Sequence, residues 1–155
     1  MSQYAATTSV SVENSRSEIE RTLTRYGAQS FMYGWDQDAA IVQFLAEERR
    51  IKFVLYLPDK SDRKFTHHSR GRRTPEAAQK EWEQGCRQRW RALALCIKAK
   101  LEAVESGIST FEDEFLAHTV LPDGSTAGEW LRPQVAEAYR TGAMPPMLPA
   151  LGAGS

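Results

Sequence analysis

The sequence contains no long hydrophobic run and only two cysteines among its 155 residues. No apolar segment approaches the roughly 20 residues that a membrane-spanning helix needs, and the first residues lack the basic and apolar regions of a secretory signal. Cys86 and Cys96 lie in one predicted helix, about 15 Å apart along its axis, too far for a disulfide. We therefore expect two buried, reduced thiols in a cytoplasmic protein without a membrane partner.

The fingerprints of common catalytic and nucleotide-binding sites are also missing. The sequence has no P-loop, GxGxxG, HExxH, GxSxG or CxxC motif. The side chains of the adjacent His67 and His68 diverge in a helix or a strand, and His118 has no cysteine pair near it. The carboxylates of residues 112–114 are consecutive, so on a helix they share no face for paired acid–base work. We expect no enzyme, no metal site and no organic cofactor.

Net charge is lacking as well, because 20 basic and 20 acidic side chains cancel. The charges are nevertheless sorted along the chain. Residues 60–100 carry 12 basic and 4 acidic side chains, whereas residues 101–155 carry 2 basic and 8 acidic ones. A cationic middle region suggests a polyanionic partner, unless the two regions simply face each other in the fold.

Hydrophobic periodicity predicts an α+β fold that begins with a helix and a three-stranded antiparallel meander. The helix is expected over residues 16–26, with a capping box formed by Ser15 and Glu18 and with Gly27 at its end. The stretches "QSFMYGWD", "AAIVQFLA" and "RIKFVLYL" are rich in β-branched, aromatic and aliphatic residues and are separated by polar turns. They are typical of three short strands joined by tight connections.

A long helix over residues 75–106 should follow and pack on the sheet. Thr74 is the expected N-cap, and Pro75 suits the first helical position. An apolar stripe runs along this helix at spacings of three and four residues: Trp82, Cys86, Trp90, Leu93, Ile97, Leu101 and Val104. Such a stripe indicates one buried face, which we expect to dock on the meander.

The C-terminal part is typical of two shorter helices. The first is expected in "STFEDEFLAHTV", with a capping box formed by Ser109 and Glu112, and the second in "STAGEWLRPQVAEAYRTG". Residues 14–142 are therefore predicted to form a single domain. A disordered tail is expected over residues 1–13 and a proline-rich tail over 143–155.

The candidate binding site is cationic and has two parts. On the long helix, four positions fall within about 20° of a common direction, roughly 110° around from the apolar stripe: Lys80, Arg87, Arg91 and Lys98. The segment before the helix has no acid between residues 63 and 73 and adds Arg63, Lys64, Arg70, Arg72 and Arg73. Together they are predicted to form a continuous surface that contacts phosphates. A solvated helix face paired with C-terminal acids is the alternative.

Aromatic side chains on the predicted sheet could add stacking platforms for unpaired bases. Tyr33, Trp35 and Phe53 are candidates, although the same residues can fill a core between sheet and helix. Trp35, next to a turn, is the best candidate for an exposed ring. We therefore predict a nucleic-acid-binding protein, with single-stranded DNA as the preferred partner. The alternative is a module that docks on an enzyme and modulates it, with the acidic C-terminal half and the "MPPMLPA" arm as the contact surface. An acidic protein partner on the cationic surface and the formation of oligomers are also possible.

Three segments, "RYGAQSFMYGWD", "RQRWRALALCIKAKLEAVESGISTFEDEFLAHTVLPDGSTAGEWL" and "MPPMLPA", resemble a family of small proteins of tailed bacteriophages and prophages. Members of this family are encoded among replication and recombination genes, so the resemblance implies an accessory role in the bacterial host cytosol. It transfers no functional residues. The order helix, three strands, helix also resembles double-stranded-RNA-binding domains and the cores of phage annealing proteins, in topology alone.

Overall fold

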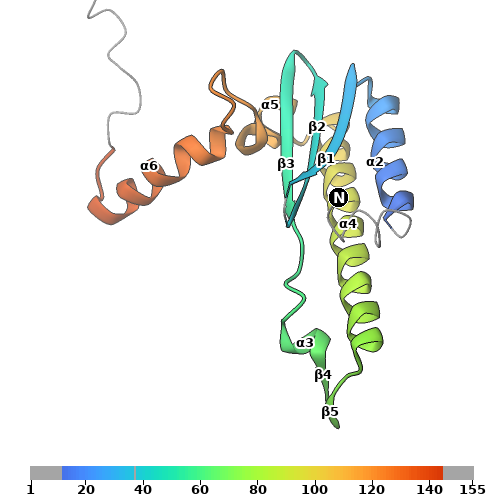
Figure 1. The fold of residues 1–155 in the computed structure, drawn as a ribbon. Coiled ribbons are helices and arrows are strands. Elements are labelled where there is room, and N and C mark those ends of the chain that lie inside the picture. Colours follow the sequence, from blue (N-terminus) through green and yellow to red (C-terminus); the bar gives the residue numbers. More distant parts are fainter. Residues whose placement is uncertain (1–11, 37, 145–155) are drawn as a thin grey trace, which may run out of the picture.

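The computed structural model describes residues 12–36 and 38–144 and confirms the predicted α+β class. Its elements, in chain order, are α2 (Glu13–Tyr26), β1 (Ser30–Asp36), β2 (Ala39–Ala46), β3 (Arg49–Tyr56), α3 (Arg63–Thr66), β4 (His67–His68), β5 (Gly71–Arg72), α4 (Pro75–Glu105), α5 (Phe111–Glu114), the 3-10 helix η1 (Leu116–His118) and α6 (Ala127–Thr141). Strands β1, β2 and β3 form an antiparallel sheet in that order. Figure 1 shows α4 behind this sheet with α2 beside it. No helix among the described residues has the length and apolarity needed to cross a membrane.

The sheet register places alternate side chains against the helices. Val42 of β2 lies between Tyr33 of β1 and Phe53 of β3, and the side chains of all three residues point toward the helices. Phe115, which follows α5, is fully buried and meets the rings of Phe44 and Phe53 edge-on at 5.7 and 6.3 Å between centroids. The segment after α4 therefore closes one end of the core.

Helix α2 begins earlier than its sequence predicts. Its N-cap is Val12, which makes no side-chain capping bond, so the predicted Ser15–Glu18 capping box is wrong. Val12 is 1% exposed and belongs to the core with Ile19. Burial of a valine side chain is worth about 1.5–3 kcal/mol, more than the roughly 1 kcal/mol of a typical cap, so packing decides where the helix starts.

The boundaries of the predicted tails change because α2 starts earlier than expected. Val12 and Glu13 belong to the folded part of the chain, so the boundary expected after residue 13 is wrong. At the other end, α6 stops at Gly142, which has the left-handed φ of 72° that glycine tolerates. Residues 1–11 and 145–155 of the two predicted tails lie outside the described residues.

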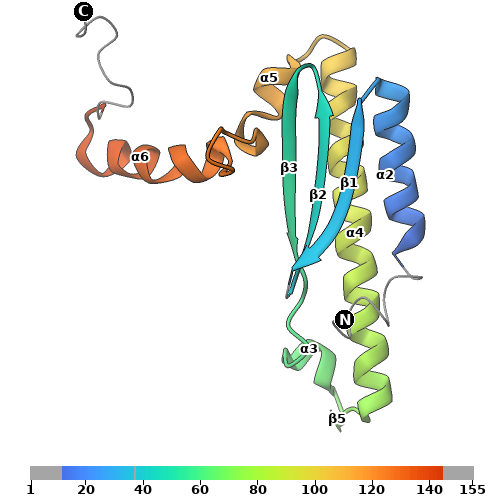
Figure 2. The same cartoon turned by 45° about the horizontal axis from the view of Figure 1, so that its top comes forward.

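Helix α4 begins at Pro75, as predicted, but only part of the helix docks on the sheet. The Thr74 hydroxyl accepts a hydrogen bond from the Ala77 amide at 3.2 Å, with Pro75 in the first turn. Its 31 residues span about 46 Å, whereas strands of seven or eight residues reach only about 25 Å. The N-terminal part of α4 therefore extends beyond the sheet, as Figure 2 shows. There, Trp82 and Cys86 pack in a second cluster with Phe65.

The basic segment before α4 is folded rather than a plain loop. Asp62 caps the single turn of α3 by accepting a hydrogen bond from the Lys64 amide at 3.0 Å. Phe65, 6% exposed, anchors α3 against α4. Strands β4 and β5 then form a small hairpin, and Gly71 adopts the positive φ of 126° that this turn requires.

The first of the two C-terminal helices is shorter than expected. Thr110, not Ser109, caps α5, since its hydroxyl accepts a hydrogen bond from the Asp113 amide at 3.1 Å. The predicted Ser109–Glu112 capping box is therefore wrong. The helix ends after one turn because Phe111 and Phe115 both enter the core, and the chain continues as η1.

The two cysteines occupy different environments, which corrects the expectation of two buried thiols. Both are free, but Cys86 is buried in the second cluster while Cys96 is exposed on α4. Burial raises the pKa of the Cys86 thiol to about 12. Since the thiolate is the reactive form, Cys86 should be inert at neutral pH.

We expect one fast-reacting thiol per native chain with a chromogenic disulfide reagent, and two after unfolding in denaturant. The variant Cys96→Ser should lose the fast phase, whereas Cys86→Ala should keep it. Two equally fast thiols in the native protein would contradict the burial of Cys86.

Candidate nucleic-acid interface

The four cations predicted on the long helix form an exposed row, here called the α4 stripe: Lys80, Arg87, Arg91 and Lys98. The row extends for about 27 Å along the helix, at 1.5 Å per residue. Ion pairs among the described residues join Arg49 to Glu112, Arg73 to Glu81, Lys100 to Glu114 and Arg140 to Glu137, and none uses a stripe cation. The acidic C-terminal region therefore does not neutralise the stripe within the described part of the chain.

The cations before α4 form a second group, here called the hairpin cations: Arg63, Lys64, Arg70 and Arg72. All four are exposed on α3 and the β4–β5 hairpin. The Lys64 ammonium lies 5.0 Å from the centroid of the Phe65 ring. No acidic side chain among the described residues lies within ion-pair distance of them.

Arg73 does not belong to the hairpin cations, although its sequence position suggests that it does. Its Nη1 lies 3.2 Å from Glu81 Oε2, and only 20% of its side chain is exposed. The Arg73 amide also donates a hydrogen bond to the Thr66 carbonyl at 2.7 Å. Arg73 thus fastens the hairpin to α4, and its guanidinium is already engaged by a carboxylate.

The two cationic groups lie on different sides of α4, so the predicted surface is divided. Arg89 donates a hydrogen bond from Nε to the Tyr56 carbonyl at 3.1 Å, which places Arg89 on the side of β3. At 100° per residue, the stripe lies about 160–200° around the helix from Arg89. Strand β3 continues into α3 on one side of α4, whereas α2 lies on the other side (Figures 1 and 2).

A hollow of about 380 Å³ lies between α3 and α4 and faces the gap between the two groups. Its lining includes Lys64 and Arg89, together with Gln84 and Gln88. The two glutamines follow the α4 surface from the hairpin side toward the stripe, since they lie about 40–80° from it. The two glutamines and the Glu81 carboxylate therefore line the surface of α4 between the two cationic groups.

Trp35 is 41% exposed, as expected from its position beside a turn. Its ring lies 6.2 Å from Tyr33, and the Tyr33 ring lies 5.4 Å from Trp90 on α4. The Arg16 guanidinium of α2 covers Tyr33 at 4.6 Å. Trp35 is thus linked to α2 and α4 through the ring of Tyr33.

The other aromatic candidates belong to the core. Phe53 is 5% exposed and stacks on the His118 ring at 4.0 Å between centroids, and Tyr33 is half-buried. Neither ring is free to stack on a base. Of the three, only Trp35 keeps the role predicted from sequence as a candidate platform.

The histidines are held by local contacts. His67 Nδ1 lies 2.7 Å from the Thr66 hydroxyl, and His68 Nδ1 accepts a hydrogen bond from the Arg70 amide at 3.0 Å. Desolvation, followed by the charges of Arg63 and Arg72, lowers the pKa of His67. No group of three potential metal-binding side chains occurs in the part of the chain that the structure describes.

Sequence reasoning missed Arg89, although it placed the two glutamines beside the stripe. Arg89 lies opposite the stripe on the helical wheel, so a search for cations on one face passes over it. Arg89 lies on the hairpin side because of where β3 ends. The periodicity within α4 carries no information about that point. The flanking glutamines were visible in the sequence, but their position between two cationic groups was not.

No protein-family model matches this chain, and comparisons with curated proteins and with solved structures give no match.

Proposed function

We propose that this protein is a nucleic-acid-binding accessory protein that holds single-stranded DNA on the exposed surface of α4 and the β4–β5 hairpin. The observation that carries the proposal is the α4 stripe. It presents four exposed cations in a row, with no carboxylate within ion-pair distance among the described residues. Each cation that meets a phosphate releases condensed counterions, which is the main source of nonspecific affinity.

The arrangement favours a flexible strand over a stiff duplex. To contact both cationic groups, a bound backbone has to cross α4, passing Gln84 and Gln88. Half the circumference of a helix about 10 Å wide is only about 16 Å, so this path requires a sharp turn. A single strand can make it, whereas bending duplex DNA over so short a length is costly. Exposed Trp35 adds a ring on which a base can stack.

Fluorescence anisotropy with labelled single-stranded, double-stranded and RNA oligonucleotides, at several salt concentrations, tests the proposal. The variant Arg87→Ala/Arg91→Ala should reduce the salt slope by roughly 1–2 units and weaken binding similarly for unrelated sequences. Arg70→Ala/Arg72→Ala should act in the same way at the hairpin, without disturbing the Arg73–Glu81 pair. Arg132→Ala/Arg140→Ala on α6 removes the same charge away from the surface and should leave the slope unchanged.

Trp35→Ala separates single-strand binding from general phosphate attraction. A stacked base is worth about 1–3 kcal/mol, so single-stranded affinity should fall at least about fivefold while duplex affinity stays constant. Equal, weak binding of all oligonucleotides by the parent and both arginine variants at low salt would refute the nucleic-acid proposal. The surface would then be assigned to an acidic protein partner.

A further inference from the structure

The hollow between α3 and α4 has a wall that one face of α4 provides. The lining residues of this helix recur at i, i+3, i+4 and i+7, and one more follows directly: Glu81, Gln84, Gly85, Gln88 and Arg89. At 1.5 Å per residue the wall is about 12 Å long, and α3 lies beside it (Figures 1 and 2). The volume of about 380 Å³ lies near the lower end of the range for ligand pockets, about 300–1,000 Å³. The hollow therefore suits a small ligand.

Gly85 allows α3 to approach α4 closely enough to give the hollow an apolar floor. A Cβ on Gly85 would lie 3.1 Å from two carbons of the Phe65 ring and 3.4 Å from a ring carbon of Pro58. Phe65 is 6% exposed and is held in the second cluster. Glycine inside a helix costs about 1 kcal/mol relative to alanine, and this close contact is a physical reason for a glycine here. The floor is thus a packed surface, against which a ligand can lie.

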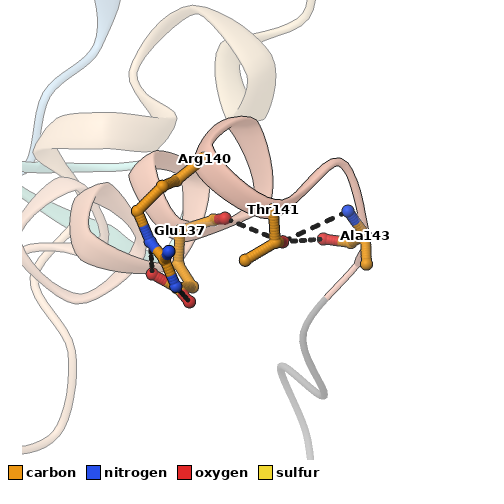
Figure 3. A network of polar contacts seen from close by, with 4 residues as sticks. All are labelled: Glu137, Arg140, Thr141 and Ala143. Atoms are coloured by element: carbon orange, nitrogen blue, oxygen red, sulfur yellow. Dashed lines mark hydrogen bonds and ion pairs between the residues drawn. The ribbon is translucent and has the colours of Figure 1, made fainter.

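Two cations line the hollow, and Arg89 keeps donors for an anion. Its Nε donates to the Tyr56 carbonyl at 3.1 Å, and no carboxylate of a described residue lies within ion-pair distance of it. The two terminal nitrogens therefore remain for a ligand. Figure 3 shows the contrasting case of Arg140, whose guanidinium is bound to both carboxylate oxygens of Glu137. Lys64 adds an ammonium from α3. A guanidinium fork beside an ammonium is well suited to a phosphate group.

The other end of the wall carries hydrogen-bonding groups suited to a nucleobase. Glu81 lies about 12 Å from Arg89 along the helix, and its Oε2 is engaged by Arg73 at 3.2 Å, which leaves Oε1 as an acceptor. Gln84 and Gln88 lie between these ends. A glutamine amide presents a donor and an acceptor side by side, as the edge of a base does, and a carboxylate accepts from an exocyclic amino group. The wall therefore fits a base at this end and a phosphate at the other.

We propose that this hollow holds one nucleotide of the bound single strand, an inference that rests on the proposed function. The base leaves the stack and lies against the two glutamines, with an exocyclic amino group toward Glu81, while its phosphate meets Arg89 and Lys64. Taking a base out of the stack costs least in a single strand. Cytosine is preferred to uracil here, because the keto oxygen of uracil would face a carboxylate. Since the other contacts of the strand are to phosphates, the pocket adds only a weak base preference.

Titration of the full chain with deoxycytidine monophosphate, followed by amide NMR, tests the pocket without relying on strand binding. Saturable shift changes should be confined to α3 and to residues 81–89 of α4. Deoxyuridine monophosphate should bind at least about fivefold more weakly, because it lacks the amino group. Deoxycytidine, which lacks the phosphate, should bind at least about tenfold more weakly. Inorganic phosphate that matches the nucleotide in affinity and shifts would overturn the proposal, because the base would then contribute nothing.

Two substitutions assign the two ends of the wall. Arg89→Gln should raise the dissociation constants of both nucleotides about tenfold, since both carry the phosphate. Glu81→Gln places a donor beside the acceptor, so the preference for cytosine over uracil should fall toward one. Arg132→Ala, which removes a positive charge on α6, is the control and should bind like the parent. A folded Arg89→Gln protein with the affinity of the parent would contradict the proposed phosphate contact.

A strand that contains 2-aminopurine reports whether a base enters the hollow, because the fluorescence of this base rises when it leaves the stack. Binding should raise the emission with the parent but not with Gln84→Leu/Gln88→Leu, which keeps the salt slope because no charge is lost. Strand binding without saturable mononucleotide shifts would overturn the pocket and leave the proposed function standing. Mononucleotide binding by a protein that binds no strand would refute the proposed function and make the hollow a site for free nucleotides.

Discussion

Replacing Trp90 by alanine should lower the free energy of unfolding by about 3–5 kcal/mol, as for other fully buried large aromatic side chains. Trp90 is completely buried between α4 and the sheet, with its ring 5.4 Å from Tyr33. It belongs to the main core, which the strands, α2 and α4 share. The loss should therefore appear as global destabilisation, measured by denaturant unfolding monitored by circular dichroism.

Leu95→Ala is the control for this experiment, since Leu95 lies on the same helix and is 51% exposed. Surface substitutions usually change stability by no more than about 0.5 kcal/mol, and both changes place alanine in α4. A Trp90→Ala protein that is within about 1 kcal/mol of the parent would show that α4 does not depend on the sheet for its position.

Replacing Trp82 by alanine should have an equally large effect that stays local. Trp82 is 4% exposed and donates a hydrogen bond from Nε1 to the Pro58 carbonyl at 2.8 Å. It packs with Phe65 and Cys86 in a cluster separate from the main core. Removing the ring should lower the opening free energy of residues 59–74 by about 3 kcal/mol, or roughly 100-fold in protection from hydrogen exchange.

Hydrogen exchange followed by mass spectrometry would distinguish this local opening from global unfolding. Peptides from β2 should change much less than those from α3 and the hairpin. Trp82→Phe, which keeps an aromatic ring but loses the bond to Pro58, should cost only about 1 kcal/mol. Equal acceleration throughout the chain would show that the two clusters unfold as one unit.

The elements that the sequence predicted well are those with a strong local signal. The stretch "AAIVQFLA" is β2 residue for residue, because alternation, β-branched residues and polar turns all indicate the same strand. Helix α4 begins at Pro75 because a threonine cap and a proline coincide there. The predicted stripe cations are exposed for a similar reason, since their position on the helix surface follows from the sequence spacing alone.

The predictions that failed concern competition between local signals and burial. Ser15 and Ser109 both precede a glutamate at capping-box spacing, yet neither caps a helix. In each case a neighbouring apolar residue, Val12 or Phe111, enters the core and moves the start of the helix. Cys96 was expected to be buried, but it lies on the outward side of α4, away from the apolar stripe.

The sequence by itself determined the α+β class, the order of α2, the three-stranded meander, α4 and α6, and the clustering of positive charge in residues 60–100. These follow from periodicities and compositions within single segments. Only the tertiary structure decided that the hairpin cations and the α4 stripe lie on different sides of one helix, that Glu81 engages Arg73, and that α6 points away from the sheet. Each depends on the direction in which a segment leaves the core, which packing between distant residues determines.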